Sequence, residues 1–308
     1  RKIFVFCCAV SQKGFVPFEA DNAKKRRFNK LEACCVWVSG AKDKTGRENK
    51  LLKKTQGLIL KLNKLGENDA LFTILTKDTQ KLTAISKGIQ SLKHKDFAAL
   101  KLFCYSEMDL SSRGNLYYVS SAQIINNFYN LRSSVEKLSA ATYIADVASI
   151  VADFAEGESE YFRFILNTLY FIEHSDECQN PISELKKLKC LFELRSASFA
   201  GFSPNTKRCT KCGKEKPLVY FDAYEGGALC SDCGGEYSDY IGEAAIKTID
   251  FLCNSDLKSA FKMTVKNESM FDAINTVSEK YISEKTEYYY KSLDYLKSAL
   301  GNKNSDDF

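Results

Sequence analysis

The stretch Cys209-Thr-Lys-Cys212, followed seventeen residues later by Cys230-Ser-Asp-Cys233, decides how the C-terminal half of this chain folds. Two residues between cysteines let one tight turn aim both sulfurs at a single ion, and the glycines directly after each pair let the backbone fold past it. This spacing is typical of a Zn²⁺ site with four thiolate ligands: Cys209, Cys212, Cys230 and Cys233. Four thiolates leave no open position for water or substrate, so the predicted zinc is structural. The alternative is a set of ordinary buried or redox-active cysteines.

The residues between the two cysteine pairs predict a short hairpin. The run from Leu218 to Ala228 contains strand-forming residues and ends in Gly226-Gly227, which returns the second pair to the first. We therefore expect a zinc-binding element at residues 206–235, inserted into a larger domain.

Composition limits the class of protein. A chain of 308 residues is long enough for about two domains, and 44% apolar with 27% charged residues is typical of soluble globular proteins. The net charge of +5 is small, so an anionic partner must be met by a local patch. Twelve cysteines, four of them in a zinc pattern, favour a reducing compartment, and we predict a cytoplasmic protein. No apolar run of membrane-spanning length occurs, so no membrane partner is expected.

Residues 1–53 differ from the rest of the chain. They carry the basic cluster Lys24-Lys25-Arg26-Arg27 and show no sustained helical or strand period. We interpret them as an extension that is disordered or not native to the protein. The alternative is a basic arm that touches nucleic acid.

Residues 54–130 predict a small β-barrel. Five short strand patterns follow one another, separated by turn signals: Gly57 to Leu62, Leu71 to Thr76, Leu82 to Ser86, Leu100 to Leu110 and Asn115 to Ile124. Five strands in about 70 residues are typical of an OB-fold barrel, a fold that often binds single-stranded nucleic acid.

The charge of this segment supports nucleic-acid binding. Between residues 54 and 101 nine lysines face four acidic residues, a difference of +5 that equals the net charge of the whole chain. The predicted DNA-binding residues are Lys61, Lys64, Lys77, Lys81, Lys87, Lys93 and Lys95, which would neutralise phosphates. Phe72, Phe97 or Tyr117 offer a stacking face, although barrel core is the favoured interpretation of these aromatic residues. The alternative for the lysines is the solvated surface of an ordinary domain.

Residues 131–205 and 236–303 predict an all-α domain. Ser133-Ser-Val-Glu136 is a capping-box pattern before an apolar stripe, and a second helix is expected from Ser159 to His174. Asn180-Pro181 starts a third helix by its cap and first-turn proline. Further helices are expected near Ser238 to Cys253 and from Ser269 to Leu300, the last split or kinked at Ser283 to Thr286. The expected fold class is therefore α+β and multidomain: an N-terminal five-stranded OB barrel, then an all-α domain with an inserted four-cysteine zinc element.

Several separated motifs, in order, resemble the RecO family of bacterial recombination mediators. Gly57-Leu-Ile-Leu60 and Leu65-Gly-Glu-Asn-Asp69 resemble the first hairpin of its OB domain, and Ala84-Ile-Ser-Lys87-Gly88 resembles its third strand. Phe192-Glu-Leu-Arg195 before Gly201-Phe202 resembles its central helix, and Gly226-Gly227 and Lys291-Ser292 complete the series. The resemblance covers residues 55 to 300. Two departures bear on DNA contact: Ala70 stands where the family usually has a basic residue, and the basic run after Gly88 is thinned to Lys93, His94 and Lys95.

The resemblance implies a DNA repair protein without catalytic turnover. RecO-like proteins bind single- and double-stranded DNA, anneal complementary strands, contact the acidic C-terminal tail of single-stranded DNA-binding protein, and with RecR help to load RecA; RecF is an indirect partner. Their site in the cell would be the bacterial nucleoid. Zinc would support the fold and not the activity. The sequence has no G-x-x-x-x-G-K-[ST] phosphate loop, so ATP hydrolysis is not expected, and neither His94 nor His174 is assigned a catalytic role.

A second hypothesis is a protein-interaction scaffold with only weak DNA contact. An apolar groove of the helical domain would receive an acidic partner peptide, with a basic rim predicted from Lys186, Lys187, Lys189 and Arg195. A third, a deaminase with catalytic zinc, is disfavoured because four cysteines close the site and no H-x-E motif precedes them.

Overall fold

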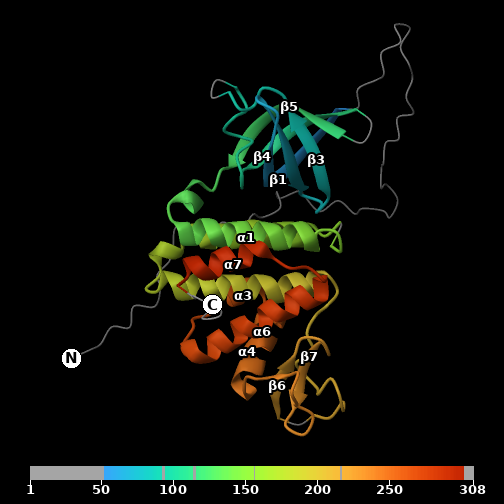
Figure 1. Cartoon of the computed structure of the whole chain (residues 1–308), viewed down its shortest axis with the longest axis vertical. Helices are drawn as coiled ribbons and strands as arrows, with labels where there is room; N and C mark the ends of the chain where they lie inside the picture. Colours follow the sequence, from blue (N-terminus) through green and yellow to red (C-terminus); the bar gives the residue numbers. More distant parts are fainter. Residues whose placement is uncertain (1–51, 92–93, 114–115, 156, 216, 302–308) are drawn as a thin grey trace, which may run out of the picture.

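The computed structural model describes residues 52–301 except 92–93, 114–115, 156 and 216. The predicted N-terminal extension lies almost wholly outside this range, as does Lys93. The described elements form three parts along the long axis of the molecule (Figure 1): a barrel at one end, layers of helices in the middle, and a small hairpin at the other end.

The N-terminal part is the predicted five-stranded barrel. Its strands are β1 (Leu52–Leu65), β2 (Asp69–Thr76), β3 (Lys81–Ser86), β4 (Tyr105–Arg113) and β5 (Leu116–Asn126). They close in the order β1-β2-β3-β5-β4, and every neighbouring pair is antiparallel except β3 and β5, which are parallel. This is an OB-like barrel, as the strand spacing predicts.

The barrel core is filled by side chains that alternate along the strands. In β2, for example, Ala70, Phe72 and Ile74 are buried while the residues between them are half-buried. The fourth strand begins at Tyr105, not at Leu100 as predicted. The amides of Ala99 and Leu100 both donate to the Asp96 carbonyl, so this apolar run turns instead of extending. Ala99, Leu100 and Cys104 fill the barrel interior.

The helical part contains the long helices that the sequence pattern predicts. They are α1 (Val135–Val151), α2 (Ser159–Glu173), α3 (Pro181–Phe199), α4 (Glu243–Asn254), α6 (Glu268–Thr286) and α7 (Lys291–Ala299), with the short α5 (Leu257–Lys262) and the 3₁₀ turns η1 (Tyr129–Arg132) and η2 (Ser175–Glu177). The cap of α1 is Ser134, one residue later than the predicted box, and its hydroxyl accepts from the Lys137 amide. The break between α6 and α7 follows Glu287, whose φ of 50° is left-handed.

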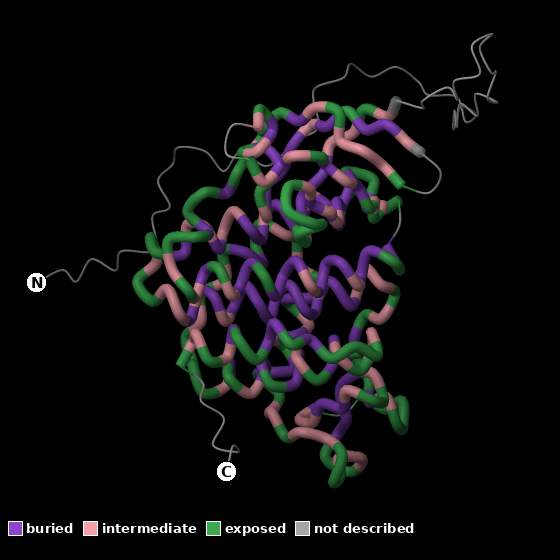
Figure 2. The backbone as a smooth tube through the Cα atoms, turned by 45° about the horizontal axis from the view of Figure 1, so that its top comes forward, coloured by how far each residue is buried: buried purple, intermediate pink, exposed green. Residues whose placement is uncertain are grey.

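Helix α1 is buried on nearly all sides because the barrel covers one face and α2, α3 and α7 cover the others. Figure 2 shows buried backbone running through this central layer. Leu138, predicted to belong to the buried stripe, is 38% exposed and does not join it. One hydrophobic core joins barrel residues such as Leu58 and Phe103 to the helices and to the hairpin.

The barrel is held on the helices by polar contacts as well as by this core. Lys61 forms an ion pair with Asp146 at 3.0 Å, and Lys81 with Asp153 at 2.6 Å. At the β2–β3 turn, the Gly157 amide donates to the Asp78 carbonyl at 3.0 Å. These contacts involve two strands and the turn between β2 and β3, so they set the orientation of the barrel and decide which of its surfaces stays open.

Candidate metal centre and nucleic-acid surface

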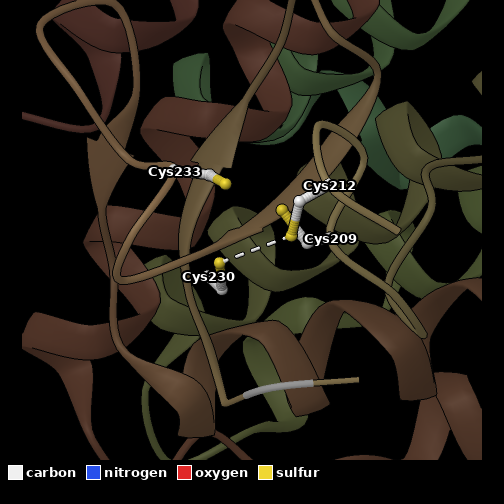
Figure 3. A group of neighbouring side chains, drawn as sticks. All are labelled: Cys209, Cys212, Cys230 and Cys233. Carbon is white, nitrogen blue, oxygen red and sulfur yellow. Dashed lines mark hydrogen bonds between the residues drawn. The ribbon is translucent and has the colours of Figure 1, made fainter. Parts of the chain in front are cut away.

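The four cysteines come together beside the hairpin, at the end of the molecule opposite the barrel. β6 (Leu218–Asp222) pairs antiparallel with β7 (Gly227–Cys230), as predicted, and the two-residue β8 (Asp239–Tyr240) pairs with the other edge of β6. All four sulfur atoms lie within 4.8 Å of one another, and the Sγ atoms of Cys212 and Cys230 are 3.9 Å apart. Figure 3 shows the sulfurs facing a common point from two turns.

This geometry fits a tetrahedral metal site. With metal–sulfur distances of ~2.3 Å, tetrahedral thiolates lie about 3.8 Å from one another, close to the observed separation. Three of the cysteines are buried or half-buried, and Cys212 is exposed at the rim. A closed set of four thiolates suits a structural divalent ion such as zinc.

The two cysteine turns have the same backbone pattern but use their glycines differently. The Gly213 amide donates to the Cys209 carbonyl at 2.8 Å, and the Gly234 amide to the Cys230 carbonyl at 3.0 Å. Gly213 has a φ of 71°, which favours glycine. At position 234 glycine is required by packing, because a Cβ atom there would lie 2.3 Å from the Tyr220 ring.

The thiols of Cys209 and Cys233 have shifted pKa values. Burial works to raise the pKa of Cys209, but hydrogen bonds from the backbone of Cys230, Cys212 and Lys211 outweigh it and lower the pKa to about 6. Hydrogen bonds with Cys212 and Cys230 raise the pKa of Cys233 to about 12. A bound divalent ion would hold its ligands as thiolates, so metal binding would release protons.

The hairpin is packed on α6. The Phe221 and Tyr281 rings meet edge to face at 5.5 Å, and Lys285 Nζ donates to the Tyr224 carbonyl at 2.9 Å. The candidate metal centre therefore lies on a hairpin that packs against the helical layer, at the end of the molecule opposite the barrel (Figure 1).

The barrel lysines predicted to bind DNA fall into two groups. Lys61 and Lys81 are paired with carboxylates of the α1 region, and Lys77 lies in the β2–β3 turn beside the same region. Lys64, Lys87 and Lys95 are exposed, and within the described residues no ion pair joins them to a carboxylate. We call these three residues the distal lysines.

The strand register places the distal lysines near one end of the barrel. Lys64 lies opposite Ala70, and Ala70 lies opposite Ser86, so the residue before Lys87 is two strands from Lys64. Two strand spacings amount to about 10 Å. Lys87 and Lys95 also line one cavity of about 290 Å³, together with Asp96 and Tyr118. No motif in the sequence marks this cavity, because its walls come from four separate segments.

The predicted stacking residues differ in their accessibility. Phe72 is fully buried in the barrel core, as favoured from the sequence, and cannot stack on a base. Phe97 is half-buried, with Lys101 Nζ 5.0 Å from its ring centre, and Tyr117 is half-buried on β5. Neither histidine is fully exposed: His94 and His174 are both half-buried.

The predicted rim of a peptide groove is wrong for two of its four residues. Lys187 is 2% exposed and donates to the carbonyls of Phe261 and Met263, and Lys189 is 4% exposed. Arg195 is half-buried and its Nε donates to the Leu252 carbonyl at 2.6 Å. The reason is that α3 is enclosed by α1, α2, α4 and α6, so its cations find partners inside the domain.

Lys189 belongs to a buried polar network that the sequence pattern does not indicate. Its Nζ contacts Glu193 at 3.1 Å and Glu279 at 3.0 Å. Burial works to lower the pKa of Lys189, but these two carboxylates outweigh it and raise the pKa. Tyr143 and Ser278 both donate to the Glu193 carboxylate at 2.6 Å. The fourth residue of the predicted rim, Lys186, is paired with Asp272 at 2.8 Å.

None of the helices within the described ranges combines the length and apolar character that crossing a bilayer requires.

Comparison with known proteins gives matches over most of the chain. The model of "Recombination protein O N terminal" matches residues 51–128, and that of "Recombination protein O C terminal" matches residues 132–294. A protein named "DNA repair protein RecO" from Acetivibrio thermocellus is 31% identical over 248 residues, which is 80% of this chain and 96% of the relative. Relatives of the same name from Alkaliphilus metalliredigens and Clostridium novyi are 29% and 28% identical, over 75% and 81% of this chain and 93% and 96% of their own length.

Proposed function

This chain belongs to the RecO family of DNA repair proteins, and on that basis we propose that it is a recombination mediator. In this role it binds single- and double-stranded DNA and anneals complementary strands that are coated with single-stranded DNA-binding protein. Together with RecR it assists the loading of RecA. The observation that carries the proposal is that both halves of the chain match the family, at residues 51–128 and 132–294.

The barrel supports DNA binding through the distal lysines. Lys64, Lys87 and Lys95 are exposed near one end of a closed OB-like barrel. Barrels of this kind commonly bind single strands by tracking the phosphate backbone with cations. Because the ion pairs of Lys61 and Lys81 hold the barrel on the helices, the distal lysines keep one orientation relative to the helical domain.

The metal centre supports the fold and takes no part in a reaction. Cys209, Cys212, Cys230 and Cys233 would hold zinc, which would cross-link the two cysteine turns. Their closed arrangement leaves no coordination position for a substrate, and the hairpin lies at the end of the molecule opposite the barrel. We therefore propose a mediator that acts by binding and aligning strands, without turnover.

The test is strand annealing with the full chain. Two complementary oligonucleotides are coated with single-stranded DNA-binding protein, either intact or lacking its acidic C-terminal tail, and duplex formation is followed by fluorescence energy transfer. The proposal expects annealing of strands coated with the intact protein, and much slower annealing when the tail is removed. Absence of annealing by folded protein that contains zinc would overturn it.

A further inference from the structure

One cavity on the barrel has lining residues that suit more than a phosphate backbone. It measures about 290 Å³ and is formed by the end of β3, residues 94–96, Ser111 of β4 and the beginning of β5. Small-molecule sites typically measure ~300–1,000 Å³, so this cavity is at the lower end of that range and suits one small planar group. The closure of the barrel creates it, because Ile85 and Tyr118 are opposite each other in the parallel β3–β5 pair.

The cavity has a buried polar floor and a cationic mouth. Ser86, Asp96 and Ser111 are 2%, 6% and 1% exposed, so they form its deep part. Lys87 and Lys95 are exposed and lie at its opening. Tyr118 and His94, both half-buried, line its walls with aromatic rings.

The hydrogen bonds already made in the cavity define what it still offers. The Asp96 carboxylate accepts from the Ala122 amide through Oδ1 at 3.1 Å, and no donor among the described residues is assigned to Oδ2. The Asp96 amide donates to His94 Nδ1 at 3.2 Å, so in the neutral ring the proton is on Nε2, a donor. The cavity thus combines a carboxylate acceptor, a ring N–H donor and an aromatic wall.

We propose that this cavity takes a single unstacked base of a bound DNA strand, and prefers bases that carry an exocyclic amino group. This inference rests on the proposed DNA binding and adds a base-reading subsite to it. The Asp96 carboxylate accepts from the amino group of cytosine, adenine or guanine, whereas it faces only the carbonyl oxygen O4 of thymine at the equivalent position. The base packs against the cavity wall to which Tyr118 contributes, and Lys87 and Lys95 neutralise the phosphates on either side of it.

A phosphate in the interior fits the cavity less well than a base. The buried Asp96 carboxylate would repel an anion placed beside it, while it accepts readily from an amino group. The two lysines lie at the opening, where the backbone of a strand would pass.

The first experiment compares two single strands that differ in one base. The full chain is titrated with an oligonucleotide of thymidines only, and with the same oligonucleotide carrying one central cytidine. We expect about tenfold tighter binding of the cytidine strand. Asp96→Asn keeps an oxygen for the Ala122 amide but replaces the free acceptor with an amide donor, so the preference should vanish or turn toward thymine. Asp78→Asn, an equal charge change at an exposed position of the same barrel, should leave the preference unchanged.

A second experiment needs no variant and so does not depend on the folding of Asp96→Asn. The central cytidine is replaced by 2-aminopurine, a fluorescent base with an amino group, and its quenching by acrylamide is measured with and without the protein. Insertion into the cavity should protect the base from the quencher, while thymidine-flanked 2-aminopurine in free DNA stays accessible.

The outcomes separate this inference from the proposed function. Binding of both strands with equal affinity and no protection of 2-aminopurine would overturn the base pocket and leave the DNA-binding proposal standing. A preference that Asp78→Asn removes as fully as Asp96→Asn would also overturn it. Failure to bind any oligonucleotide would overturn both.

Discussion

The distal lysines should account for most of the salt dependence that the barrel contributes to single-strand binding. The perturbation is a triple variant in which Lys64, Lys87 and Lys95 are all replaced by glutamine. These three residues are exposed and have no carboxylate partner within the described residues, so each one is available to neutralise a phosphate.

The size of the effect follows from the number of contacts. Each phosphate contact on a single strand contributes about −0.7 to the slope of log affinity against log salt, so losing three contacts reduces the steepness of that slope by about 2.1. Between 50 and 200 mM salt the wild-type protein should therefore lose roughly 20-fold more affinity than the triple variant.

The control replaces the two lysines of the predicted set that are already paired with carboxylates, Lys61 and Lys81, by glutamine. They form the ion pairs with Asp146 and Asp153. These partly exposed pairs contribute only about 0–1 kcal/mol each, so the control should stay folded, and its slope should equal that of the wild type.

The assay is fluorescence anisotropy with a labelled single strand at four or more salt concentrations, with circular dichroism as the check of folding. An equal loss of slope per replaced lysine in the two variants would refute the reasoning, because it would show that the ion pairs with Asp146 and Asp153 do not withdraw Lys61 and Lys81 from DNA. An unchanged slope in the distal variant would refute it as well.

Three further predictions concern the fold. Cys209→Ser should reduce the zinc content from about one ion per chain to nearly none, as measured by mass spectrometry of the purified protein, and a wild-type protein without zinc would contradict this. Lys189→Met leaves buried carboxylates without their cation and should lower the free energy of unfolding in urea by about 3–5 kcal/mol. Lys186→Met removes a half-buried lysine of the same helix that pairs with the exposed Asp272, so it should change this free energy by less than about 1 kcal/mol, and similar losses in the two variants would count against the buried network. Gly227→Ala would place a Cβ atom 2.3 Å from the backbone oxygen of Asn205, so it should lower the free energy of unfolding by about 1–3 kcal/mol and speed hydrogen exchange in residues 218–230. Unchanged exchange in this segment would show that the backbone moves apart to accommodate the Cβ atom without loss of stability.

Some structural expectations depended only on residues close together in the chain, and these were confirmed. The cysteine pairs predicted a cluster of four ligands, and all four sulfurs lie within 4.8 Å. A short turn brings the two sulfurs of each cysteine pair together. The hairpin that begins at Leu218 needs only local strand propensity, and it brings the second cysteine pair back to the first. The same is true of Asn180-Pro181, which caps and starts α3 as predicted.

The errors came where a local pattern has more than one tertiary outcome. The apolar run from Ala99 to Cys104 has the composition of a strand, but it is turned into the barrel interior. Helix α3 carries several charged residues, which from sequence indicate a solvated face. It is instead enclosed, because the carboxylates that compensate Lys189 come from Glu193 on the same helix and Glu279 on α6.

The sequence by itself therefore determined the strand and helix pattern, the cysteine ligands and the resemblance to a family, because each depends on the spacing of residues within one segment. Only the tertiary structure decided which lysines remain open to DNA. Lys81 and Asp153 are 72 residues apart in the chain, and their pairing exists only because the barrel is docked on α1. The cavity around Asp96 likewise requires four separate segments of the closed barrel. Charge and hydrophobicity along a chain specify which side chains need a partner, but contacts between distant segments specify which partner each one finds.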